Sequence, residues 1–192
     1  MANEWREHPA LHGKFHPENP DDVQVYIHDG GIHPDRMPEL VWVTVTGKEE
    51  FPFGDVFSGT VLNQPFRLRA VAQHQHIHFM APIGFPYPFL VTENYLARRA
   101  KWRICLCPRC GMPELFSFGN YPEPGDNSGV DDFKSTPQCP ACLGRMVIAW
   151  RKGEDDPYTS HLNTQYEARA PFTYEETSDQ KQAPRKWWQF WR

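Results

Sequence analysis

The sequence predicts a mainly β protein with a small helical part: an antiparallel β-meander or half-barrel, a four-cysteine zinc ribbon and an irregular C-terminal tail. Three observations support this prediction. Apolar residues alternate with polar ones through the first half of the chain, nineteen prolines and thirteen glycines interrupt long helices, and four cysteines form two Cys-x-x-Cys pairs. We expect an N-terminal arm (1–20), a small β-domain (21–91), a short helix with the ribbon (92–150) and a tail with an aromatic end (151–192).

The β-domain begins with two runs in which every second residue is apolar, VQVYIH (23–28) and LVWVTVTG (40–47). Two further strands are expected in FSGTVLNQPF (57–66) and RLRAVAQHQHIHF (67–79), because turn-forming residues separate these runs. The proline-rich FMAPIGFPYPFLV (79–91) is expected to cover the open edge of the sheet as extended chain.

WVTVTG, a short spacer and FSGTVLNQPF resemble the sequence pattern of an uncharacterised bacterial family, domain-of-unknown-function 2314. The residues that carry the resemblance are Trp42, Val43, Val45, Gly59, Leu62, Asn63 and Pro65. The match covers about a third of the chain and weakens after Pro65, where AVAQHQHIHF departs from the family pattern. The resemblance implies a small β-rich domain without a defined chemistry, and by analogy a toxin-neutralising immunity protein.

A short helix, YLARRAKW (95–102), is expected after the β-domain, with Thr92 as its N-cap. This helix and the first cysteine pair contain a basic cluster that we consider as a nucleic-acid patch, in which cations neutralise phosphates and an aromatic ring stacks on a base. The alternative is a solvated helix face whose charges pair with Asp126, Asp131 and Asp132. The cluster consists of Arg98, Arg99, Lys101, Trp102, Arg103 and Arg109.

The two Cys-x-x-Cys pairs predict a structural metal site with four thiolate ligands, Cys107, Cys110, Cys139 and Cys142. Each pair contains a proline, is followed closely by a glycine, and precedes a strand-like run, LFSF (115–118) or MVIAW (146–150). The 28 residues between the pairs include a hydrophilic loop of turn-forming residues. Zinc is the expected ion, and iron fits the same four sulfurs. A fully protein-coordinated ion has no open position, so we expect no catalysis there; Cys105 is expected beside the site.

The segment His74-Gln-His-Ile-His78 is a second candidate site. If it is a strand, His74, His76 and His78 share one face, and two of them can approach one ion. A metalloenzyme would need a third ligand, for which His28, His33, Asp29 and Glu93 are candidates. The alternatives are a polar strand face without metal, or pH-sensitive binding by clustered imidazoles.

The C-terminal residues Trp187, Trp188, Phe190 and Trp191 lie among arginine and lysine side chains. We expect this end to dock onto a partner or onto the chain's own β-domain, with contact to a membrane interface as a further alternative. No transmembrane segment or export signal is expected, and the clustered cysteines indicate a reducing, cytoplasmic location. The predicted function is zinc-stabilised binding of another protein, such as a toxin. A nucleic-acid-binding zinc ribbon and a metalloenzyme based on the three histidines are the alternatives.

Overall fold

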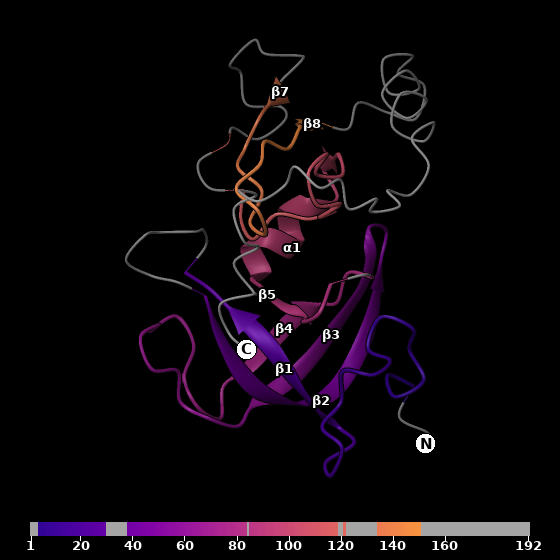
Figure 1. Ribbon diagram of the computed structural model, residues 1–192, viewed down its shortest axis with the longest axis vertical. Helices are drawn as coiled ribbons and strands as arrows, with labels where there is room; N and C mark the ends of the chain where they lie inside the picture. The colour runs from indigo at the N-terminus through magenta and orange to yellow at the C-terminus, as the bar shows by residue number, and fades with distance from the viewer. Residues whose placement is uncertain (1–3, 30–37, 84, 119–120, 122–133, 151–192) are drawn as a thin grey trace, which may run out of the picture.

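A computed structural model of the protein describes residues 4–29, 38–83, 85–118, 121 and 134–150. Within these residues the structure is mainly β, with one short helix. Five strands form a barrel, α1 lies at one end of it, and a small sheet lies beyond the helix (Figure 1). The predicted fold class is confirmed. No helix in the described ranges has the length and hydropathy that a membrane crossing requires.

The barrel is a meander that closes on itself. Its strands are β1 (Asp22–Ile27), β2 (Glu39–Phe51), β3 (Gly54–Val61), β4 (His76–Met80) and β5 (Phe89–Val91). Consecutive strands pair antiparallel, so β1 and β5 run in the same direction. Their parallel pairing at Tyr26 and Phe89 closes the barrel. The proline-rich segment therefore does more than cover an edge, because its last three residues form a strand.

The β2–β3 pair shows why one glycine is required in this barrel. A Cβ atom on Gly59 would lie 2.5 Å from Val43 Cγ1 and 2.6 Å from the Thr44 carbonyl oxygen. No side chain fits at these distances, so glycine permits the close approach of β2 and β3. The register shifts between Val45 and Gly47, where β2 bulges.

The third predicted strand is wrong over residues 62–66, and the fourth is wrong over residues 67–75. β4 begins only at His76, and residues 62–75 form a long loop, here called the Phe66 loop. The Glu39 carboxylate accepts hydrogen bonds from three consecutive backbone amides of this loop, those of Phe66, Arg67 and Leu68, at 2.7, 2.6 and 2.8 Å. A strand would direct successive amides to opposite sides, so this carboxylate holds a turn instead.

Both faces of the strands are buried at one end of the barrel. Val25, Phe57, Phe79 and Leu90 point into the barrel core, together with Leu11 of the N-terminal arm. Their neighbours in the strands belong to a second core outside the barrel, shared with α1 and the small sheet; these neighbours are Tyr26, Val56, Met80, Phe89 and Val91. The alternation of strand side chains thus supplies both cores.

Helix α1 (Glu93–Arg99) connects the barrel to the small sheet. The side chain of Thr92 accepts a hydrogen bond from the Tyr95 amide at 3.1 Å, which confirms the predicted N-cap. The small sheet consists of β6 (Trp102–Ile104), β8 (Ile148–Trp150) and β7 (Lys134–Ser135), in that order. The last three residues of the predicted MVIAW strand are present as β8. LFSF is not a strand, although Leu115, Phe116 and Phe118 are buried.

Candidate metal centre

Two short loops supply the four cysteines. The first, Cys107–Cys110, follows β6, and the second, Cys139–Cys142, lies between β7 and β8. In each loop, the residue directly after the second cysteine has a positive φ, 74° for Gly111 and 60° for Leu143. The left-handed conformation at this position turns the chain back toward its first cysteine.

The two loops also share a pattern of backbone hydrogen bonds. In each, the first cysteine donates its amide to the residue five positions later, and its carbonyl accepts from the residue four positions later. These bonds are Cys107 to Met112 (2.9 Å) and Gly111 to Cys107 (2.8 Å) in the first loop, and Cys139 to Gly144 (2.6 Å) and Leu143 to Cys139 (2.9 Å) in the second. The common turn directs two sulfurs of each loop toward the other loop.

The four sulfurs are arranged as a metal site requires. All four Sγ atoms lie within 4.8 Å of one another. The Cys107–Cys142 pair is 3.6 Å apart and the Cys110–Cys139 pair 3.5 Å. Four sulfurs at about 2.3 Å from a tetrahedral ion lie about 3.8 Å from one another. The thiols are free rather than disulfide-bonded, so the donor set and its spacing fit a metal ion with four thiolate ligands.

Backbone amides point at the sulfurs. The Ala141 amide donates to Cys139 Sγ and the Gly144 amide to Cys142 Sγ, each at 3.4 Å. Such donors stabilise the thiolate, the form of cysteine that binds a metal. The pKa of the Cys110 thiol is lowered to about 5, mainly by a hydrogen bond with Cys139 and to a smaller extent by the Met112 amide. The same hydrogen bond, with burial, raises the pKa of Cys139.

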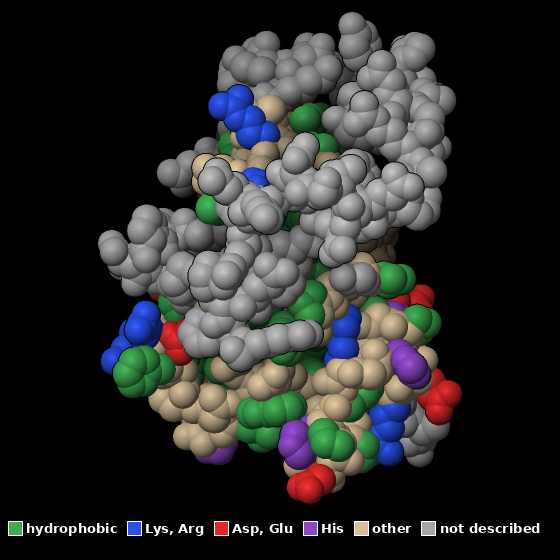
Figure 2. Space-filling model, viewed as in Figure 1, with side chains coloured by type: hydrophobic (Ala, Val, Ile, Leu, Met, Phe, Trp, Pro, Cys, Tyr) green, Lys and Arg blue, Asp and Glu red, His purple; other side chains and the backbone are tan. Residues whose placement is uncertain are grey.

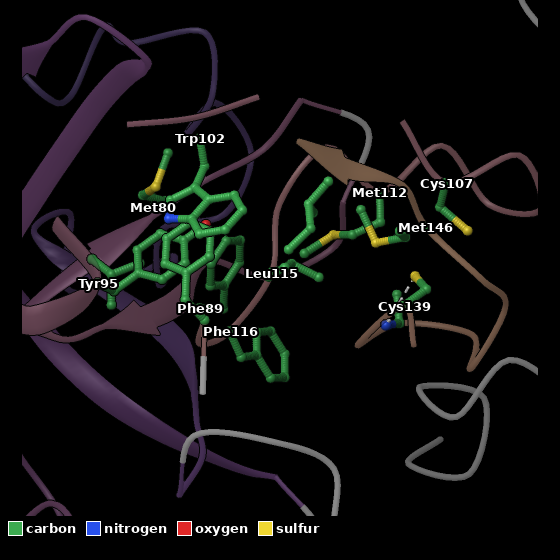
Figure 3. Close-up of a cluster of buried hydrophobic side chains, with 14 of the residues drawn as sticks. Met80, Phe89, Tyr95, Trp102, Cys107, Met112, Leu115, Phe116, Cys139 and Met146 are labelled. Atoms are coloured by element: carbon green, nitrogen blue, oxygen red, sulfur yellow. Dashed lines mark hydrogen bonds between the residues drawn. The ribbon is translucent and has the colours of Figure 1, made fainter. Parts of the chain in front are cut away.

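The four-cysteine group belongs to the core outside the barrel. Cys107 and Cys139 are buried in one continuous apolar cluster with Met112, Leu115 and Met146 (Figure 3). In Figure 3 these side chains lead from the sulfurs to the aromatic group around Trp102. A change in the geometry of the sulfurs therefore acts directly on the packing between the small sheet and the barrel.

Cys105 lies outside the four-sulfur group. Its side chain is half-buried, its amide donates to the Val147 carbonyl at 2.9 Å, and burial raises the pKa of its thiol. These contacts are those of a residue in the sheet rather than of a metal ligand.

The predicted basic patch needs correction, because three of its six residues are not available at the surface. Arg98 and Arg99 are buried at 8% and 6% exposure, and Trp102 is fully buried. Arg98 donates to the Tyr121 carbonyl at 2.6 Å. A buried Trp102 cannot stack on a base, and the remaining cations of the set are Lys101, Arg103 and Arg109.

Arg99 instead forms a buried ion pair that the sequence interpretation missed. Its Nε and one terminal nitrogen donate to the two carboxylate oxygens of Glu114, each at 2.7 Å, and the Tyr95 hydroxyl donates to the same carboxylate. The signal was present in the sequence, since Glu114 is a single acidic residue within the apolar run MPELFSF. A carboxylate inside such a run needs a buried cation. The aspartates proposed as partners for the basic residues lie outside the described ranges.

The three histidines are divided by the start of β4. His76 and His78 belong to the strand, with ring centroids 5.6 Å apart, whereas His74 lies before it with φ of 66°. His28, proposed as a third ligand, is buried, stacks on Phe116 at 4.1 Å and hydrogen-bonds to the Leu90 carbonyl at 2.8 Å. Within the described ranges, the four cysteines are the only group of three or more potential ligands with suitably close donor atoms.

The aromatic C-terminal residues, the whole tail and His33 lie outside the described residues. The sequence matches no protein-family model, and no curated protein and no solved structure is significantly similar to it. The resemblance to domain-of-unknown-function 2314 stays a prediction. The described residues form a closed β-barrel and, outside it, a group of four cysteines that could hold a metal ion.

Proposed function

We propose that this is a zinc-stabilised binding protein, in which the metal centre is structural and the barrel presents a recognition surface to another protein. Two knuckles with four thiols favour zinc over ions that prefer oxygen or mixed ligands. The four protein ligands complete a tetrahedral shell, so neither water nor substrate has a position on the ion. The metal then contributes to folding, and the biological activity belongs to the surface.

The Phe66 loop is the feature that supports recognition. Phe66 is 82% exposed, and the Arg67 guanidinium lies 6.0 Å from its ring centroid. Arg69 is also exposed. An exposed aromatic ring beside arginines is the composition typical of the residues that contribute most binding energy at protein interfaces.

The loop is held by several contacts although it is long. Pro65, Leu68 and Val71 anchor it in buried positions. Besides the contacts of Glu39, side chains within the loop bind its backbone: Gln73 Nε2 donates to the Leu62 carbonyl at 2.8 Å, and Gln75 accepts from the Ala72 amide at 2.9 Å. A loop ordered before binding loses less conformational entropy when it docks.

The charged side chains of the loop and of the strands after it indicate the partner's chemistry, because the Glu39 carboxylate next to the loop is already bound to three backbone amides. From Val61 to Thr92 the sequence contains no Asp or Glu, but it contains Arg67, Arg69 and three histidines. Among the described residues visible in Figure 2, apolar side chains lie interspersed with polar and charged ones. These features favour an acidic protein surface with a pocket for an aromatic ring. A toxin with such a surface is one partner of this class.

The metal is tested by elemental analysis of the purified full-length chain. One equivalent of zinc is expected. Less than half an equivalent of zinc and iron together would contradict a metal-stabilised protein, whereas a full equivalent of iron would replace zinc as the assigned ion.

Recognition is tested by affinity capture from nuclease-treated lysate of the source cells, comparing the original chain with Phe66→Ser and Ile83→Ser. Ile83 has the same 82% exposure but lies outside the Phe66 loop, so it is a matched control. The partner is expected to be captured by the original chain and by Ile83→Ser, and lost with Phe66→Ser. Identical capture by all three would contradict the proposal, and capture seen only from a parallel lysate without nuclease would identify a nucleic acid instead.

A further inference from the structure

We infer that His76 and His78 form a second, exchangeable site for a divalent transition-metal ion on the outer face of β4. The burial of the strand alternates: Ile77 and Phe79 point into the barrel core, whereas His76 is exposed and His78 half-buried. Residues two apart in a strand share one face. The two imidazoles therefore lie next to each other on the surface, apart from the thiolate centre.

The spacing of the rings suits a shared ion. Their centroids are 5.6 Å apart. An ion about 2.1 Å from a ring nitrogen lies roughly 3.2 Å from that ring's centroid. Two rings at the observed spacing then subtend roughly 120° at the ion, compared with about 109° in a tetrahedral shell.

The rings can reach this arrangement without moving the strand. They are now nearly perpendicular, with an interplanar angle of 85°. Rotation about χ2 turns the ring nitrogens toward a common point and leaves the centroid almost in place, because the centroid lies close to the Cβ–Cγ axis. This torsion is soft in histidine, so the adjustment is small.

The surroundings of the pair favour an ion that exchanges with solvent. The paired residues of β3 are Thr60, opposite His76, and Ser58, opposite His78. The Thr46 hydroxyl lies 3.4 Å from His76 Nε2 and helps to hold that ring over the sheet. Imidazole suits zinc, copper and nickel ions. Because two ligands leave coordination positions open, water or a ligand from a bound molecule completes the shell.

The test titrates Ni²⁺ into the full-length, zinc-loaded chain without an affinity tag, followed by calorimetry and by paramagnetic broadening of histidine ring resonances. One equivalent of Ni²⁺ is expected to bind, with selective broadening at His76 and His78 and with the zinc retained. Removal of a residue that only hydrogen-bonds to a metal ligand typically weakens metal binding about 10- to 100-fold, so His76→Gln and His78→Gln, which each remove a direct ligand, are expected to weaken binding at least as much.

His74→Gln is the matched control, because His74 lies next to the pair in sequence but outside β4. Its Ni²⁺ affinity is expected to equal that of the original chain. Unchanged affinity in His76→Gln, equal weakening in His74→Gln, or Ni²⁺ uptake only with release of zinc would each overturn the inference. Because His76 and His78 lie in β4 and the cysteines lie in the two loops around β6–β8, loss of the nickel site is expected to leave the zinc content unchanged, which separates this result from a failure of the proposed structural metal.

Discussion

Gly111 and Leu143 occupy equivalent positions in the two cysteine loops, with φ angles of 74° and 60°. Each follows the second cysteine of its loop and donates its amide to the carbonyl of the first. One loop therefore uses glycine at a left-handed position, and the other holds a leucine there that is 53% exposed.

This equivalence predicts opposite effects for two substitutions. Gly111→Ala is expected to lower the free energy of unfolding by about 1–2 kcal/mol, the cost of left-handed backbone for an L-residue. Open space surrounds the added Cβ, so no steric clash contributes. Leu143→Gly removes the same backbone strain, and little buried surface is lost because Leu143 is largely exposed. The free energy of unfolding is therefore expected to rise by roughly 0.5–1 kcal/mol, after subtracting the entropy cost of ordering a glycine. Urea unfolding of the metal-loaded proteins measures both; a loss in Leu143→Gly would contradict this explanation.

Removal of the metal is expected to disrupt the core between the small sheet and the barrel. Four-thiolate zinc sites contribute on the order of 10 kcal/mol to folding, and Cys107 and Cys139 lie within the same cluster as Trp102 and Trp150. Chelator, or Cys110→Ser, should therefore lower the melting temperature, change tryptophan fluorescence and increase binding of a hydrophobic dye.

Cys105→Ser is the control for this experiment, since Cys105 is outside the group of four sulfurs. It should retain the metal and the tryptophan signal. A chelated protein with the same unfolding curve as the metal-loaded one would show that the centre does not support the core.

Because the Arg99–Glu114 ion pair is buried, replacing one partner is expected to lower the free energy of unfolding more than replacing both. The Arg99 and Glu114 side chains are only 8% and 5% exposed. Glu114→Gln leaves the guanidinium charge buried without a counter-charge and should cost about 3–5 kcal/mol of unfolding free energy. Replacing both residues, as Arg99→Met with Glu114→Leu, should recover part of that loss; the remainder reflects the buried Tyr95 hydroxyl, which loses Glu114 as its acceptor. A double variant no more stable than Glu114→Gln would contradict this expectation.

His28 predicts how stability changes with pH. Burial lowers its pKa to about 4, below about 6.5 in the unfolded chain. Above pH 6.5 the imidazole is neutral in both states, and stability does not depend on it. As the pH falls from 6.5 to 4, the unfolded state binds more protons, and the protein loses up to about 3 kcal/mol.

The comparison between the original chain and His28→Gln isolates this effect, because acid release of the metal affects both. Glutamine keeps a donor for the Leu90 carbonyl but does not titrate. The unfolding free energy of the His28→Gln variant should fall less steeply between pH 6.5 and 4 than that of the original chain. Parallel plots of unfolding free energy against pH for the two proteins would exclude His28 as the cause.

Part of this structure could be predicted because it depends on local patterns. Alternating residues specified β1 and β2, Thr92 specified the start of α1, and the Cys-x-x-Cys spacing identified the sulfurs that come together. Each of these signals lies within a few residues of the feature that it predicts. Strand alternation, helix capping and the cysteine turn follow from backbone geometry.

Other features were decided by contacts between distant parts of the chain. Glu39 holds the amides of residues 66–68 and prevents a strand there. Arg99 is buried in an ion pair with Glu114, so it does not belong to the basic surface that the sequence predicted. The local sequence shows that Glu39, Glu114 and Arg99 are charged, but it does not show which groups they bind in the folded chain. A buried charge must be paired, and only the folded chain brings the pair together.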